Sequence, residues 1–160
     1  MNHTPVIHDT FTIERVLDAP VARVFEALAN PEVKAQWFAG PSSWTQVERS
    51  FDFRVGGRER LGGSFEAGMT SLFEAGYLDI VLNERVVYVY EMLVNGRKIS
   101  TSLATWELFS QGTKTRLVLT EQGAYFHDPE MKRYAPGGQA KSRVSGTEAL
   151  MDKFAAIFSH

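Results

Sequence analysis

The stretch from Gln139 to Ser159 constrains the fold most, because it has the pattern of one long amphipathic helix. Its apolar side chains recur every three or four residues, which places them on one face of a helix. These residues are Val144, Thr147, Leu150, Met151, Phe154, Ile157 and Phe158. Charged residues, among them Lys141, Arg143, Glu148 and Lys153, are expected mainly on the opposite face. An apolar stripe of this length needs an apolar partner, which the preceding chain must supply.

Most of the chain before this helix has the pattern of antiparallel strands. Apolar and polar residues alternate over residues 10–18 and in several segments between residues 44 and 121. Asn95-Gly96 is the strongest hairpin signal, because both residues tolerate the positive φ of a tight turn. The spacing predicts a sheet of about six to seven strands joined by hairpins.

Two short helices are predicted after the first strand. Pro20 suits the start of the first helix, and Asn30-Pro31 ends it and opens a second, up to Phe38. The whole pattern predicts an α+β fold in which a curved antiparallel sheet wraps around the C-terminal helix and leaves a hollow. We expect residues 1–160 to form one domain with an ordered core of about 10–158, and residues 122–138 to form an irregular connection that gates the hollow.

Composition restricts the classes of function. The chain of 160 residues has no cysteine, which excludes disulfides and thiolate chemistry. Its net charge of −2 gives no general reason to bind nucleic acid or an anionic membrane. The first residues lack the pattern of a signal peptide, and no apolar run approaches the ~20 residues that span a bilayer. A cytoplasmic location without membrane insertion is therefore the expectation.

Short motifs along the chain resemble those of a known family. They are Arg15, Ala19-Pro20, Val24-Phe25, Ala27, Pro31, Trp37-Phe38, the run 52–57, Gly76-Tyr77, Ile80, the run 85–88, Gly112-Thr113 and the run 120–123. Together they resemble the Aha-type branch of the START-like (SRPBCC) superfamily, named for an activator of the heat-shock chaperone ATPase. The resemblance spans residues 10–158 and implies the helix-grip fold of the birch pollen allergen. Members commonly have a Gly-Trp pair in the last helix; Gly146-Thr147 stands here instead, which implies a larger cavity.

The hollow is the predicted binding site for a small, largely apolar or aromatic molecule. Its expected lining is Trp37, Phe38, Phe53, Phe73, Trp106, Leu117, Leu119, Gly146, Leu150 and Phe154. The chain has no phosphate-binding loop, dinucleotide fingerprint or zinc-ligand spacing, so no cofactor and no metal are expected. Exposed strand edges are compatible with a homodimer but do not require one.

Two other functions stay open beside binding, which we favour over catalysis. Superfamily relatives act as cyclases, aromatases or hydrolases in similar cavities, and such an activity would need inward polar groups. The candidates are His127, Glu74 and Tyr77, although His127 before Asp128-Pro129 also suits a solvated turn and Glu74 also suits the solvent face. The family name suggests a chaperone cofactor or a stress-response protein. That activator has a separate N-terminal domain, which we expect a chain folding from about residue 10 to lack.

Overall fold

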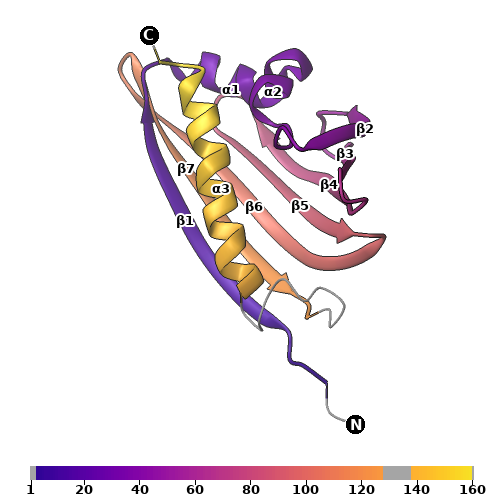
Figure 1. Ribbon diagram of the computed structural model, residues 1–160. Coiled ribbons are helices and arrows are strands. Elements are labelled where there is room, and N and C mark those ends of the chain that lie inside the picture. The colour runs from indigo at the N-terminus through magenta and orange to yellow at the C-terminus, as the bar shows by residue number, and fades with distance from the viewer. Residues whose placement is uncertain (1–2, 128–137, 160) are drawn as a thin grey trace.

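The computed structural model describes residues 3–127 and 138–159, which form a curved antiparallel sheet and three helices (Figure 1). The strands are β1 (Ile7–Leu17), β2 (Trp44–Phe51), β3 (Arg58–Phe65), β4 (Thr70–Val81), β5 (Arg85–Val94), β6 (Arg97–Gln111) and β7 (Lys114–Tyr125). The helices are α1 (Val21–Ala29), α2 (Pro31–Trp37) and α3 (Gly138–Ala156). The seven strands lie in the order β1-β7-β6-β5-β4-β3-β2, and every neighbouring pair is antiparallel.

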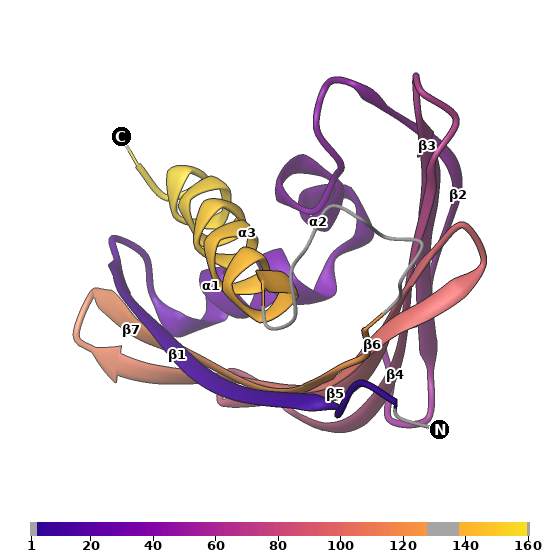
Figure 2. The ribbon, with the colours of Figure 1, turned by 60° about the horizontal axis from the view of Figure 1, so that its bottom comes forward.

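The long helix α3 lies on the concave side of this sheet. It runs alongside β1 and β7 in Figure 1. Figure 2 shows the sheet bending from β1 and β7 beneath α3 round to β2 and β3 beside α2. The predicted helix-grip fold is confirmed in its strand number, its two short helices and its C-terminal helix.

Three strand pairs contain a bulge, and β2 approaches β3 very closely at Gly63. The register shifts between Gln46 and Glu48, between Tyr77 and Asp79, and between Met92 and Leu93. Bulges of this kind bend a strand and increase its twist. At Gly63, a Cβ atom would stand 2.4 Å from the ring of Trp44, so only glycine lets β2 lie this close to β3.

Aromatic side chains fix the C-terminal half of α3 to the rest of the core. The ring centroids of Phe154 and Trp37 are 4.9 Å apart, and that of Trp106 lies 5.5 Å from Phe154. Trp37 donates its indole N–H to the carbonyl of Ala27 at 2.8 Å, which satisfies the polar atom of a buried ring. This cluster joins α3 to α2 and β6.

Two strands extend beyond their predicted ends. β1 begins at Ile7 rather than Thr10, and β7 continues to Tyr125, so residues 122–125 are strand and not irregular connection. The extension follows from pairing, because Tyr125 lies opposite Ile7 on one side and Ser100 on the other. Residues 128–137 of the predicted gate lie outside the described residues. In the described part of the chain, no helix is long and apolar enough to cross a membrane.

Candidate ligand-binding cavity

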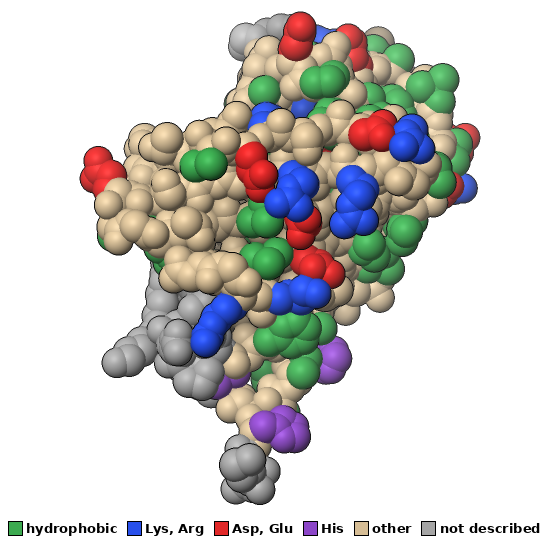
Figure 3. All heavy atoms as spheres, turned by 90° about the vertical axis from the view of Figure 1, so that its right-hand side faces the viewer, with side chains coloured by type: hydrophobic (Ala, Val, Ile, Leu, Met, Phe, Trp, Pro, Cys, Tyr) green, Lys and Arg blue, Asp and Glu red, His purple; other side chains and the backbone are tan. Residues whose placement is uncertain are grey.

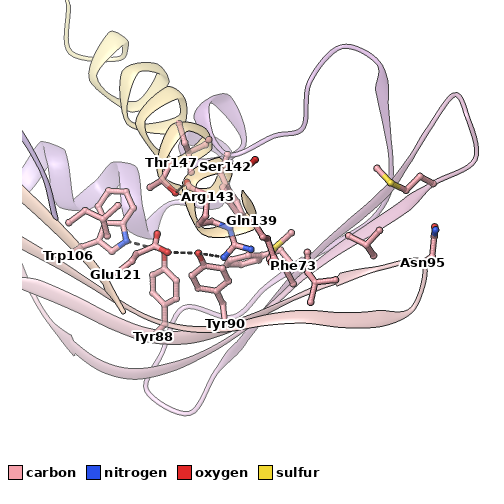
Figure 4. Close-up of a pocket in the computed structure, with 18 residues that line it drawn as sticks. Phe73, Tyr88, Tyr90, Asn95, Trp106, Glu121, Gln139, Ser142, Arg143 and Thr147 are labelled. Atoms are coloured by element: carbon pink, nitrogen blue, oxygen red, sulfur yellow. Dashed lines mark hydrogen bonds between the residues drawn. The ribbon is translucent and has the colours of Figure 1, made fainter. Parts of the chain in front are cut away.

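A cavity of about 470 Å³ lies between the sheet and the N-terminal half of α3 (Figure 4). Its apolar lining comes from Phe38, Met69, Phe73, Met92, Val94, Ile99, Trp106, Leu119, Gly146 and Leu150. Its polar lining comes from Tyr88, Tyr90, Asn95, Glu121, Gln139, Ser142, Arg143 and Thr147. A volume of this size and a mostly apolar wall with a few polar groups are typical of small-molecule sites.

The polar groups are centred on Arg143, which reaches from α3 toward the sheet (Figure 4). Its Nη1 donates to the hydroxyl of Tyr90 at 3.1 Å, and its Nη2 donates to the hydroxyl of Ser100 at 2.8 Å. Tyr90 in turn donates its proton to the carboxylate of Glu121. The guanidinium also lies 5.3 Å from the ring centroid of Tyr125. A cation from the helix is thus joined to a buried carboxylate of β7 through a tyrosine of β5.

Burial and charge change the proton affinities of these groups. Burial raises the pKa of the Glu121 carboxyl, while the hydrogen bond from Tyr90 and the charge of Arg143 act in the opposite direction. Burial also raises the pKa of Tyr90, which stays protonated and able to donate. Burial lowers the pKa of Arg143, but Tyr90, Tyr125 and Glu121 more than compensate, so the guanidinium keeps its charge.

A second buried polar cluster lies outside this cavity. Lys34 Nζ donates to Glu59 at 2.6 Å and to the hydroxyl of Tyr77 at 3.1 Å, and Tyr77 donates to the same Glu59 oxygen at 2.6 Å. The void beside this cluster is only about 10 Å³, which holds no organic ligand. Tyr77, one of the residues considered for catalysis, is therefore hydrogen-bonded to Lys34 and Glu59 and does not line the large cavity.

Six of the expected lining residues surround the large cavity. They are Phe38, Phe73, Trp106, Leu119, Gly146 and Leu150. The other four lie elsewhere: Trp37 and Phe53 border the small void beside Lys34, and Leu117 and Phe154 are fully enclosed in the core. These four side chains pack against their neighbours and do not border the large cavity.

The two remaining catalytic candidates lie away from the cavity. Glu74 alternates with Phe73 on β4 and pairs on the opposite sheet face with Arg60, which also holds Glu48 at 3.0 Å. Figure 3 views the side where β2, β3 and β4 lie and shows acidic and basic side chains next to one another. His127 is exposed beyond the end of β7, and Asp128 lies outside the described residues.

The sequence reasoning missed Arg143 and Glu121 as parts of the cavity. Arg143 was assigned to the polar face of the helix, yet it precedes the buried Thr147 by one turn and extends its side chain under α3. Glu121 follows Leu117 and Leu119 at steps of two residues, so strand alternation already placed it on the inward face. The position of Glu121 in the same series as Leu117 and Leu119 was the signal that could have predicted a buried carboxylate.

Comparison with known proteins agrees with this architecture. Residues 18–159 match the model of the family described as Activator of Hsp90 ATPase homolog 1-like protein. The chain therefore belongs to this family, as the motifs indicated. Among curated proteins, none matches the chain.

Solved structures of bacterial proteins share the fold. The protein Mll3558 of Rhizobium loti is 38% identical, with a TM-score of 0.83 over 96% of this chain and 99% of that one. An uncharacterized protein of Rhizobium leguminosarum is also 38% identical, with a TM-score of 0.85 over 96% of each chain. The protein CV1439 of Chromobacterium violaceum, at 24% identity and a TM-score of 0.71 over 93% of this chain and 96% of that one, shows likeness of fold alone.

Proposed function

We propose that this protein binds a small, largely apolar molecule in the cavity between the sheet and α3. The observation that carries the proposal is the cavity itself: about 470 Å³, with an apolar wall and one polar cluster. Burial of apolar ligand surface against such a wall contributes roughly 25 cal/mol per Å². The polar cluster then selects among molecules of similar size.

The packing around the cavity supports this proposal. The aromatic cluster of Trp37, Trp106 and Phe154 holds the C-terminal half of α3 in place, so the space under the N-terminal half does not depend on a ligand for its walls. A cavity that exists before binding saves the ligand the cost of ordering the protein.

Binding is better supported than catalysis, because none of the three residues considered for catalysis lines the cavity. Tyr77 is bonded to Lys34 and Glu59, Glu74 faces the other side of the sheet, and His127 is exposed. Binding requires only the cavity and its polar cluster.

Native mass spectrometry of the freshly purified protein tests the proposal, with the same sample measured after denaturation. We expect a ligand-sized mass that is lost on denaturation. The protein freed of any bound molecule is then titrated with the neutral apolar dye N-phenyl-1-naphthylamine. We expect the fluorescence of the dye to rise and to saturate at one dye molecule per chain. A protein that carries no mass and binds no dye would contradict the proposal.

A further inference from the structure

We infer that the molecule bound in this cavity carries a carboxylate group, and that Arg143 binds it. This inference rests on the proposed function and adds the chemical class of the ligand. It starts from the placement of a guanidinium in an otherwise largely apolar cavity, where a cation is costly without a partner. The position of Arg143 among the lining residues is visible in Figure 4.

The hydrogen bonds of Arg143 leave it with capacity to bind a ligand. A guanidinium has five N–H donors. One donor goes to Tyr90 and one to Ser100, and both acceptors are neutral hydroxyl oxygens. Within residues 3–127 and 138–159, no further acceptor is bonded to Arg143. The planar fork matches the two oxygens of a carboxylate, which it binds with paired hydrogen bonds.

Glu121 is the obvious competitor for Arg143, and Tyr90 keeps the two apart. The Tyr90 hydroxyl donates to Glu121 and accepts from Arg143, so the guanidinium reaches the Glu121 carboxylate through the tyrosine. A ligand carboxylate therefore need not displace Glu121 in order to contact Arg143. The ordinary cost of bringing a second carboxylate nearby is reduced when Glu121 holds a proton, which burial favours.

The rest of the lining suits an apolar body attached to that carboxylate. Phe73, Met92, Ile99 and Leu150 line the same cavity as Arg143, and their side chains carry no charge. Methionine adapts to ligands of different outline because its side chain is flexible. The geometry points to an aliphatic or aromatic carboxylic acid.

The side-chain oxygen of Gln139 indicates that the ligand carries a hydrogen-bond donor in addition to its carboxylate. Gln139 lies one helical turn before Arg143, and its Nε2 donates to the carbonyl of Phe126 at 3.2 Å. Its Oε1 is buried and accepts no hydrogen bond from any described residue. Buried polar atoms are normally bonded. A hydroxyl or amide N–H of the ligand, near its carboxylate, would satisfy this oxygen.

Three probes with the same chain and different head groups test the inference: decanoate, 1-decanol and decylamine. Each is used to displace N-phenyl-1-naphthylamine from the cavity at pH 7. We expect decanoate to bind at least about tenfold more tightly than 1-decanol, since hydrogen bonds to a charged group contribute about that much. Decylamine is expected to be the weakest of the three.

Variants of Arg143 test whether this residue causes the preference for decanoate over 1-decanol. Arg143→Met keeps an unbranched apolar stem, and we expect it to lose the preference for decanoate over 1-decanol, whatever its affinity for the dye. Arg143→Lys keeps the charge without the fork, so a partial preference is expected. Arg116→Met is the matched control, because Arg116 lies on the outer face of β7 and pairs with Glu14.

The outcomes separate this inference from the proposed function. Binding of the dye with decanoate no better than 1-decanol, or a preference that survives in Arg143→Met, would overturn the carboxylate assignment and leave the binding cavity intact. Failure of the wild-type protein to bind the dye would count against both. Loss of the decanoate preference in Arg143→Met alone, with Arg116→Met unchanged, would establish the assignment.

Discussion

Lys34 Nζ lies 2.6 Å from Glu59 Oε1, and the two side chains are only 7% and 3% exposed. The pair joins α2 to β3 inside the core, and Tyr77 of β4 donates to the same carboxylate. Burial lowers the pKa of Lys34, while Glu59 opposes the change by attraction and by a hydrogen bond. The ammonium group therefore depends strongly on the Glu59 carboxylate.

Replacing Glu59 with leucine is expected to lower the free energy of unfolding by about 3–5 kcal/mol, because it leaves a buried ammonium without its counter-charge. Urea denaturation measures the loss. The double variant Lys34→Met, Glu59→Leu removes both charges and should recover part of it. Asp52→Ala, which breaks the exposed Asp52–Arg54 pair, is the control and should cost at most about 1 kcal/mol. Equal losses in Glu59→Leu and Asp52→Ala would contradict this account.

Gly146→Leu is expected to stabilise the protein and to weaken ligand binding. A Cβ atom at Gly146 meets nothing within 4 Å, and glycine in a helix costs roughly 0.8–1 kcal/mol relative to alanine. The new side chain would occupy part of the cavity that Gly146 lines. Thermal unfolding and dye titration measure the two effects.

Ala149→Leu provides the comparison for Gly146→Leu, since Ala149 is exposed on the same helix and does not line the cavity. It should leave dye binding unchanged. If both variants bound the dye as the wild-type protein does, the cavity would not be the dye site.

Stability is expected to depend on pH through Glu121. Burial raises its pKa above the ordinary value of 4.5, so the folded protein holds this proton at pH values where the unfolded chain has released it. The free energy of unfolding therefore falls as the pH rises from about 4.5 through the pKa of the folded state.

Urea denaturation of the wild-type protein and Glu121→Gln between pH 4.5 and pH 8 measures this effect. The stability of the wild-type protein relative to Glu121→Gln should be greatest at the low end and decline toward pH 8. Glu148→Gln, at an exposed position of α3, serves as the reference. If the stability of the wild-type protein relative to Glu121→Gln increased with pH, the pKa of Glu121 would not be raised in the folded protein.

The β5–β6 hairpin is expected to be sensitive to the loss of glycine at position 96. Asn95 and Gly96 have φ values of 51° and 78°, and nothing lies within 4 Å of a Cβ atom at Gly96. Gly96→Ala should thus cost about 1–2 kcal/mol through the backbone alone. Gly76→Ala, in a strand with ordinary backbone angles and a nearest contact of 3.9 Å, should cost less by the same denaturation measurement.

Alternation and turn chemistry were sufficient to predict the order of elements, but they left open which face of each strand lines the cavity. The hairpin at Asn95-Gly96 follows from its turn chemistry, and Phe73, Trp106 and Leu119 were expected to line the cavity and do so. The extension of β1 to Ile7 was not predictable, because it depends on pairing with a strand over a hundred residues away.

The cavity was only partly predictable, because an inward side chain borders empty space only where its neighbours leave some. Leu117 and Leu119 point the same way from β7, yet Leu117 is enclosed and Leu119 lines the cavity. Arg143 lines the cavity because its long side chain reaches Ser100. Dividing the helix into an apolar and a polar face does not take this reach into account.

The two halves of α3 carry different tasks. Phe154 ties the C-terminal half to Trp37 and Trp106, whereas Gly146 and Leu150 face the cavity. Substitutions at Gly146 or Leu150 therefore change the cavity without removing the ring contacts of Phe154 that hold the helix. If the proposed function holds, this separation lets a substitution at Gly146 or Leu150 alter ligand choice while the scaffold around Phe154 is kept.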